Sequence, residues 1–333
     1  WRGCFYINVP FGILSTLVVY YIFKKRGHKD KTENPPIDIT GLIFLTIGIS
    51  SLQIMLDKGN DLDWFSSRII IVLALLSFIF LTLLVIWEWY HKNPMINVKF
   101  FLNRNFTVGA LSISIGSAAF FASVVVIPLW LQNYMGYTAF KSGLATSTLG
   151  IAIMFVAPVL GTQLNKFDTR KVVIFGFISF TAACFITGNY TPDVTAGYIA
   201  FSRFLSGIGL GFFFLPLNTI TLSDIPDNDL AGASGVYNFM RNIGNSFGTS
   251  LSVNFWNHRI AVHHQDLAAA VNTGNPNFIL FIHQTAGSFQ EKLVIINEMI
   301  TEQAALMGVN DIIIGSGIMI LFLIPLVMLA KKQ

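Results

Sequence analysis

The chain has few charged residues: Asp, Glu, Lys and Arg make up 11% of its 333 residues, whereas hydrophobic residues make up 53%. A soluble globular domain carries about 25% charged residues, so this composition excludes an ordinary soluble fold. Cysteine is also scarce, with only Cys4 and Cys184, far apart in apolar segments. This pair excludes a disulfide framework and a CxxC metal pair, and we expect two buried free thiols.

Long apolar runs take the place of the missing charge. Runs of about 20 residues, the length that crosses a bilayer core of roughly 30 Å, recur along the chain. They predict nine membrane-spanning helices, at roughly residues 5–23, 38–56, 69–89, 106–131, 143–164, 172–189, 195–217, 231–256 and 312–330. The sequence therefore predicts an all-α polytopic membrane protein.

Lysine and arginine are unevenly distributed between the loops. One set of alternate loops holds 13 of the 21 basic residues and the opposite set holds 6, while Arg203 and Arg241 lie inside predicted helices. By the positive-inside rule the richer set is cytoplasmic, which places Trp1 outside and Gln333 inside. The basic residues do not gather on one face, so we expect no nucleic-acid binding.

One predicted helix, residues 231–256, carries a polar stripe. Asn238, Arg241, Asn242 and Asn245 are spaced i, i+3, i+4, i+7 and therefore share one helical face. A charge at mid-bilayer costs roughly 3 kcal/mol on insertion scales, so Arg241 needs a wet cavity or a partner helix. Two interpretations stay open: a cavity-facing cation of a substrate pathway, or a structural arginine bonded to carbonyls of a neighbouring helix. The three asparagines favour the pathway.

Arg203, in the predicted helix 195–217, is a second candidate for the pathway. Because it lies towards the outer end of that helix, it could instead snorkel to the interface, and both interpretations stay open. Several glycines have the positions that permit close helix packing. They are Gly207, Gly209, Gly211, Gly244 and Gly248.

Titratable groups are missing from the middle of every predicted span: no Asp or Glu lies there, and all six histidines are expected in loops. Proton coupling needs a titratable group in the pathway, and arginine stays protonated. If the protein is a proton antiporter, its proton-carrying carboxylate is therefore expected in helices that precede this sequence. A phosphate loop, a catalytic triad and a metal cluster are also lacking, so we expect neither an enzyme nor a bound cofactor or metal.

Short motifs along the chain resemble those of one transporter family. They are WRGCFYINVP at 1–10, LQxMLDxG at 52–59, DWF at 63–65, NFT at 105–107, GYTA at 136–139, PLNTITLS at 216–223 and NFxR at 238–241. These motifs are similar to those of the EmrB/QacA-type multidrug exporters, the 14-helix branch of the major facilitator superfamily, and most of all to its EmrB group.

The resemblance implies a division of the chain. Residues 1–23 would end a six-helix N-terminal half, and residues 24–105 would hold a cytoplasmic loop and two extra linker helices. Residues 106–333 would form the six-helix C-terminal half, with a large external loop at 257–311. Five N-terminal helices of such an exporter would be missing from this sequence.

The resemblance also implies a function: proton-coupled antiport of hydrophobic drugs by alternating access, in the bacterial inner membrane, with a proton gradient as the energy source. The implied partners are hydrophobic drugs, protons, the lipid bilayer, a periplasmic EmrA-like adaptor and an outer-membrane TolC-like channel. Two alternatives stay open. One is an exporter of a siderophore, lipid or metabolite on the same fold, and the other is a membrane scaffold or sensor that does not transport.

The segment 161–171 resembles the superfamily loop G-x-L-x-D-R-x-G-R-R, which helps to latch one conformational state. Its candidate latch residues are Gly161, Lys166, Asp168, Arg170 and Lys171. Asn165 stands where the pattern has Asp, and Asp168 stands where it has Gly, so a latch would act through the remaining charges. The alternative is a plain solvated basic loop.

Two further features lie at the outer side. Gln53 and Asp57, one helical turn apart at the end of a predicted span, form a candidate outer gate, with an ordinary interfacial position as the alternative. The external loop contains His258, His263 and His264, whose spacing defines no metal geometry. It also contains a predicted helix at about 289–307, which we expect on the membrane surface or against a partner.

Overall fold

The computed structural model describes residues 6, 8–26, 38–59, 61–91, 94, 96–272 and 274–331. Cys4, most of the motif at 1–10 and the basic residues Lys29, Lys31, Lys92 and Lys332 lie outside the described residues. The chain divides into two units, residues 1–39 and 40–333. The described residues of the first unit include the helix α2 (Asn8–Arg26), with an apolar stretch at Val9–Ile22.

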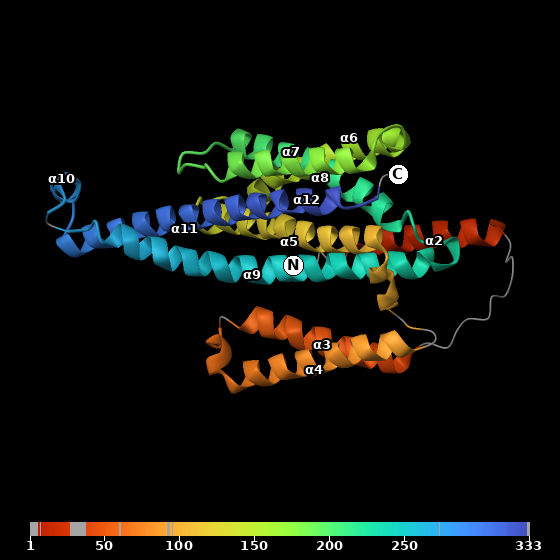
Figure 1. The fold of residues 1–333 in the computed structure, drawn as a ribbon. Coiled ribbons are helices and arrows are strands. Elements are labelled where there is room, and N and C mark those ends of the chain that lie inside the picture. The colour runs from red at the N-terminus through yellow and green to blue at the C-terminus, as the bar shows by residue number, and fades with distance from the viewer. Residues whose placement is uncertain are drawn as a thin grey trace. The chain divides into compact units, whose positions relative to one another are not determined.

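The second unit is helical (Figure 1). A hairpin comes first, of α3 (Ile39–Lys58), which begins at the unit boundary, and α4 (Arg68–Tyr90). The helices that follow are α5 (Arg104–Asn133), α6 (Ala139–Gln163), α7 (Thr169–Thr187), α8 (Ala196–Leu222), α9 (Leu230–Ala268), α10 (Pro276–Gln284), α11 (Phe289–Leu321) and α12 (Leu323–Met328). Short 3-10 turns occur at Trp64–Ser66, Val98–Leu102, Leu164–Lys166 and Asp227–Asp229.

Seven segments of the described chain are long and apolar enough to cross a membrane: α3, α4, α5, α6, α7, α8 and the stretch Phe289–Met328 that joins α11 to α12. The sequence predicted nine spans. Of the other two, α2 has only a shorter apolar stretch. The other, α9, has 39 residues, but its polar stripe makes it less apolar than its neighbours.

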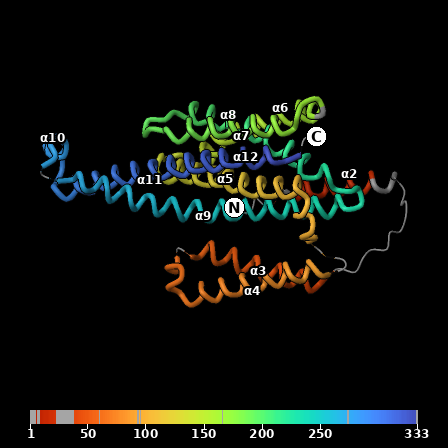
Figure 2. Tube along the Cα trace, viewed as in Figure 1, coloured from red at the N-terminus to blue at the C-terminus, as the bar shows by residue number. Residues whose placement is uncertain are grey.

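The helices from α5 onwards pack around a common core. α8 packs against α6 and α7, and α5 packs against α9, α11 and α8 (Figure 2). Large side chains such as Trp130, Phe177 and Phe213 are fully buried between them. By contrast, Met154 and Phe155 on α6 are 75% and 68% exposed, which suits a surface that faces lipid.

Glycines give the closest helix contacts, as the sequence predicted. A Cβ atom on Gly244 of α9 would collide with the Ser114 carbonyl of α5, and one on Gly207 of α8 would collide with the Leu149 carbonyl of α6. One on Gly209 would lie about 2.5 Å from the Phe180 backbone nitrogen of α7. Since lipid tails are as apolar as the helices themselves, backbone packing of this kind is what holds membrane helices together.

Several family-like motifs form turns. In the α3–α4 connection, a Cβ atom on Gly59 would lie 2.7 Å from the Trp64 ring, and Asp63 and Trp64 have positive φ angles of 54° and 49°. Gly136 has φ 65°, and Thr138 caps α6 by accepting a hydrogen bond from the Lys141 backbone. These motifs therefore fix the ends of helices, where left-handed backbone favours glycine.

Much of the segment expected as an external loop at 257–311 is helical instead. α9 continues to Ala268, because no glycine or proline interrupts residues 257–268, so His258, His263 and His264 lie on a helix rather than in a loop. α11 begins at Phe289 as predicted, with a capping box of Ser288 and Glu291, but it runs to Leu321 instead of ending near residue 307. The α9 and α11 extensions are joined where the Trp256 indole donates to the Ala305 carbonyl at 3.0 Å.

Candidate functional site

The polar stripe of α9 combines exposed and half-buried side chains. Asn238 and Asn242 are exposed, whereas Arg241 and Asn245 are half-buried. The Asn238 amide donates a 2.8 Å hydrogen bond to the Ser234 carbonyl of its own helix. The stripe thus presents one cation and amide groups along an otherwise small and apolar helix.

The structure adds two residues to this stripe. The Tyr237 side chain is buried, with 2% exposed, and its hydroxyl has no hydrogen-bond partner among the described residues. Arg241, one turn further along α9, and Asn218 of α8 contribute to its electrostatic surroundings. Asn218 comes from α8, so the polar surface extends over two helices. Sequence reasoning placed Asn218 only in the PLNTITLS motif, and the packing of α8 on α9 that brings it near Tyr237 has no signal in the sequence.

Asn242 lines a cavity of about 180 Å³ between α9 and α3, together with Gln53, Phe239 and Ser246. The candidate gate residue Gln53 therefore shares a cavity with one residue of the stripe. The cavity is smaller than the roughly 300–1,000 Å³ of a typical small-molecule site, so it could form only part of a larger site.

Next to this cavity, the candidate gate residues bind α9. The Gln53 amide donates to the Asp57 carboxylate at 3.0 Å and to the Ser250 hydroxyl at 3.3 Å, and the Ser250 hydroxyl also donates to Asp57. The Asn254 amide donates to the Leu56 carbonyl at 3.2 Å. Polar groups of α9 thus hold the C-terminal part of α3.

Arg203 is buried among hydroxyl groups, with 2% of its surface exposed. Its side chain therefore does not extend to the membrane interface, which was one of the two interpretations of the sequence. Its guanidinium donates to Ser123 on α5 at 3.3 Å and to Thr187 on α7 at 3.2 Å, and Tyr190 lies close by. None of the ion pairs found in the described part of the chain includes Arg203. It therefore links three helices as an unneutralised cation.

The candidate latch residues divide into bonded and free groups. Asp168 caps α7 by accepting a 3.1 Å hydrogen bond from the Arg170 backbone and also pairs with its guanidinium at 3.4 Å. Arg170 additionally donates to the Ala330 carbonyl at 3.0 Å. Burial disfavours the charged Asp168 carboxylate, but the Arg170 hydrogen bonds and charge outweigh it and hold the pKa of Asp168 below its ordinary value.

The other latch residues have open surroundings. Lys166 and Lys171 are exposed, and a Cβ atom on Gly161 would meet no described atom within 4 Å. The side chain of Asn165, where the pattern has Asp, lies outside the described residues. Within the described residues, Asp168 and Arg170 therefore serve the C-terminal helices, and Lys166 and Lys171 remain available to other groups.

Sequence reasoning missed a charged cluster between α9 and α11. The Asp311 carboxylate accepts from the Arg259 guanidinium at 2.7 Å and lies 2.6 Å from the His263 ring nitrogen. Among the described residues, no group of three or more His, Cys, Asp or Glu side chains is placed to hold a metal ion. The cluster is thus a helix-joining network.

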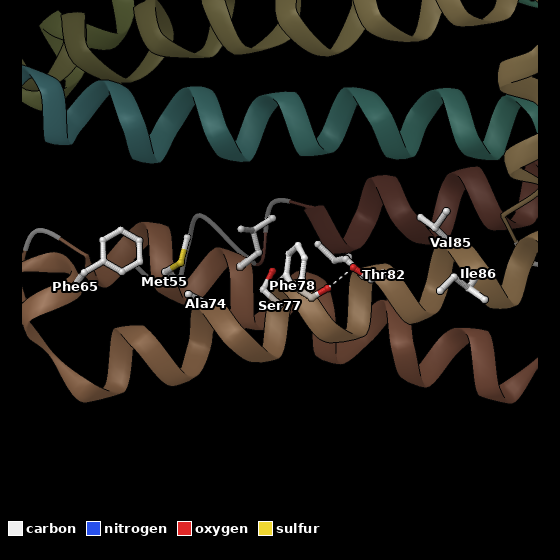
Figure 3. A pocket seen from close by; sticks show the side chains of 10 residues that line it. Met55, Phe65, Ala74, Ser77, Phe78, Thr82, Val85 and Ile86 are labelled. Carbon is white, nitrogen blue, oxygen red and sulfur yellow. Dashed lines mark hydrogen bonds between the residues drawn. The ribbon is translucent and has the colours of Figure 1, made fainter.

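A larger groove, of about 620 Å³, runs along the α3–α4 hairpin (Figure 3). Met55, Phe65 and Phe78 are among its lining side chains, and the Thr82 hydroxyl in its wall donates to the Phe78 carbonyl at 2.7 Å. The described residues that line it are uncharged. The groove therefore offers apolar contact without groups that would orient a ligand.

The sequence matches the Major Facilitator Superfamily over residues 1–249. The chain belongs to this superfamily. Its relatives include the multidrug export protein EmrB of Escherichia coli K12, which is 39% identical over 99% of this chain and 65% of the relative. The probable multidrug resistance protein EmrY of the same strain is 38% identical over 99% and 65%. The fatty acid resistance protein FarB of Neisseria gonorrhoeae is 35% identical over 99% and 66%.

These matches confirm the resemblance found in the sequence, together with the all-α fold. The chain spans about 65% of the length of its EmrB relatives. Membership of the superfamily and the seven apolar segments of the described chain indicate a multi-pass membrane protein. The Arg241 stripe, the Asn242 cavity and the Gln53–Asp57 contact with Ser250 are the candidate functional surfaces of the described helices.

Proposed function

We propose that this chain forms most of a proton-driven exporter that moves hydrophobic drugs out across the bacterial inner membrane. The observation that carries the proposal is the polar stripe of α9, on which Arg241 and Asn245 are half-buried and Asn242 lines a cavity, in an otherwise apolar bundle. The names of the EmrB and EmrY relatives support drugs as the substrate class.

The proposed mechanism is alternating access, in which two helix bundles rock around a central site. The Arg241 guanidinium and the amides of Asn218 and Asn242 would bind polar groups of the drug, while neighbouring Phe side chains cover its apolar part. No carboxylate lies on the polar stripe itself. Because coupling needs a group that gains and loses a proton in the pathway, we place the proton carrier on another helix of the full-length transporter.

The proposal includes partners on the outer side. The paired extensions of α9 and α11, with α10 between them, form the external surface where we place a periplasmic adaptor that leads to an outer-membrane channel. Arg259, His263 and Asp311 would hold this surface in shape by joining the two helices.

A second candidate function is the export of fatty acids. The similarity to FarB, whose name records fatty acid resistance, favours it. So does Arg241, because a guanidinium is suited to a carboxylate head. The two functions differ in what they require of Arg241. A neutral drug needs hydrogen bonds from the polar stripe, whereas the carboxylate of a fatty acid needs the positive charge of Arg241.

The test uses the full-length transporter, meaning the gene product with any N-terminal segment that its gene encodes. Cells that lack their own drug exporters are loaded with a neutral hydrophobic dye or a fluorescent fatty acid, and efflux is followed with and without an uncoupler. The variants are Arg241→Ala and Arg241→Lys, and the matched control is Arg104→Ala, an exposed arginine at the start of α5. Membrane levels are equalised by quantitative blotting.

We expect uncoupler-sensitive dye efflux that falls about tenfold or more in Arg241→Ala, the effect of losing a hydrogen bond to a charged group, and is unchanged in Arg104→Ala. The second function would be favoured if the parent exports the fatty acid but not the dye. In that case Arg241→Ala should abolish fatty-acid efflux and Arg241→Lys should keep it. Equal efflux by all variants would remove Arg241 from the site. If the parent protein exports neither probe, both functions are wrong.

A further inference from the structure

A second groove lies far from the polar stripe, where α6 ends and α7 begins. It has a volume of about 310 Å³. Val159 and Gln163 of α6 line one side, and Lys171 and Phe175 of α7 line the other, with Phe212 of α8 in its wall. Val159 and Phe175 are 55% and 53% exposed, so the groove opens on the membrane-facing surface of the bundle.

Along both walls of the groove, the side chains change from apolar to polar in the same direction. Val159 and Gln163 are four residues apart on α6, and Phe175 and Lys171 are four residues apart on α7, so each pair lies along one helix face. In both pairs the apolar residue lies deeper in the helix and the polar residue lies at its end. The Phe175 and Phe212 rings pack edge to face, with centroids 4.9 Å apart, in the apolar part.

The polar end of the groove is positively charged. Lys171 lines this end, and Lys166 lies in the turn between α6 and α7, outside the lining residues. Both are exposed, and neither forms an ion pair within the described part of the chain. Asp168 also lines the groove, but its carboxylate is already paired with Arg170. A net positive charge therefore remains, at the helix ends that the positive-inside rule assigns to the cytoplasm.

We propose that this groove binds an anionic phospholipid of the cytoplasmic leaflet, with its phosphate between Lys171 and Lys166 and one acyl chain along Val159, Phe175 and Phe212. The charge complementarity selects an anionic headgroup, and the groove between the helices takes the chain. Basic sites between membrane helices on the cytoplasmic side have this lipid preference. A long lysine stem can lie along apolar side chains while its ammonium group reaches the headgroup layer.

The test measures lipid retention rather than transport, so its result is independent of the proposed export function. The full-length transporter is purified in detergent, equilibrated with equal amounts of phosphatidylglycerol and phosphatidylcholine, and analysed by native mass spectrometry. The charge variants are Lys171→Gln and Lys166→Gln, and the groove variant is Val159→Trp, which fills the groove at an exposed position. The matched control is Lys141→Gln, an exposed lysine at the other end of α6.

We expect preferential retention of phosphatidylglycerol, reduced about fivefold by Lys171→Gln, the factor that corresponds to one lysine near an anionic headgroup. Lys166→Gln has the same direction of effect, Val159→Trp lowers retention with both charges intact, and Lys141→Gln equals the parent. Equal retention by Lys171→Gln and Lys141→Gln, or by Val159→Trp and the parent, would overturn the proposal.

Two further arms separate the lipid from other occupants. Inorganic phosphate alone should not displace phosphatidylglycerol, because it cannot fill the apolar part; full displacement would reduce the groove to a simple anion site and overturn the proposal. Binding of the dye used for transport is measured on the same variants. If Lys171→Gln and Val159→Trp lower dye binding but not lipid retention, the groove takes the drug and the proposal is wrong.

Discussion

Asp311 on α11 accepts a 2.7 Å hydrogen bond from the Nε atom of Arg259 on α9. The His263 ring nitrogen lies 2.6 Å from the same carboxylate oxygen and 3.1 Å from the Arg259 guanidinium. One carboxylate thus serves two side chains on successive turns of α9. It holds together the part of the α9–α11 pair that the sequence led us to expect as a loop.

The first prediction concerns this network. Asp311→Asn removes the negative charge and leaves Arg259 facing a neutral amide. Because the Arg259 and Asp311 side chains are 30% and 35% exposed, water screens the pair, and we expect a loss of about 1 kcal/mol in the free energy of unfolding. Thermal unfolding in detergent measures it.

The control for that experiment is Asp266→Asn, an exposed carboxylate on α9, which should unfold like the parent. A double-mutant cycle with Arg259→Gln isolates the interaction from other effects. A coupling energy near zero would show that the pair contributes no stability, and the helical extension would then depend on Trp256 and its neighbours.

The second prediction concerns the closest contact between α9 and α5. Gly244→Ala places a methyl group against the Ser114 carbonyl, a backbone atom that cannot move aside, so the helices must separate. We expect a loss of about 1–3 kcal/mol, the usual range for overpacking, seen as a lower unfolding temperature.

The same helix supplies the control for Gly244. A Cβ atom on Gly235 would meet no described atom within 4 Å, so Gly235→Ala should be neutral or stabilising by up to about 1 kcal/mol through the loss of glycine flexibility. If both variants unfold at the same temperature, close packing at Gly244 does not determine the stability of the pair.

These residues also show what the sequence could and could not predict. The glycine spacing predicted close packing, because it depends on one helix alone, and the i, i+3, i+4, i+7 spacing predicted that Arg241 shares a face with its asparagines. The partners across the helices were not predictable. Asn218 near Tyr237 and Ser250 beside Asp57 depend on how separate helices pack, and neither helix records that in its own pattern.

The extent of α9 was missed for a related reason. Its stripe and its histidines lower its hydropathy, so an apolar window ends the helix near residue 256 although the backbone continues to Ala268. Helix formation beyond the membrane is stabilised here by contacts to α11, such as Trp256 to the Ala305 carbonyl. A search for apolar runs cannot detect a helix of this kind.

The third prediction tests why Arg203 is buried. The two hydroxyl groups that bind Arg203 have other hydrogen-bond partners. The Ser123 hydroxyl donates to the Phe120 carbonyl at 2.8 Å, and the Thr187 hydroxyl donates to the Ala183 carbonyl at 2.8 Å. Arg203→Met therefore removes a desolvated cation and leaves both hydroxyls satisfied. We expect the unfolding free energy to stay within about 1 kcal/mol of the parent or to increase.

A comparison with Arg203→Ala separates packing from charge. That variant leaves a cavity among α5, α7 and α8 and should lose about 2–5 kcal/mol, as large-to-small changes in a core do. If Arg203→Met unfolds as readily as Arg203→Ala, the charge itself stabilises the bundle. A stable Arg203→Met variant that has lost dye efflux would instead assign the cation to transport.

The fourth prediction follows from the Asp168 carboxylate at the start of α7. Despite partial burial, which opposes ionisation, the Arg170 hydrogen bonds and charge keep the pKa of Asp168 below its ordinary value of 3.8. A carboxyl whose pKa is lower in the folded protein stabilises the fold above its unfolded pKa, here about pH 4, and this stabilisation disappears as the pH falls through the folded value. Unfolding temperatures measured from neutral pH down to about pH 3 should therefore fall less steeply at the acid end for Asp168→Asn than for the parent.

Asp227→Asn, which changes an exposed carboxylate in the α8–α9 connection, is the control and should follow the parent curve. If Asp168→Asn follows it too, the Arg170 pair does not contribute to the stability of the α7 cap, and both residues would be free to act between the transporter halves as a latch.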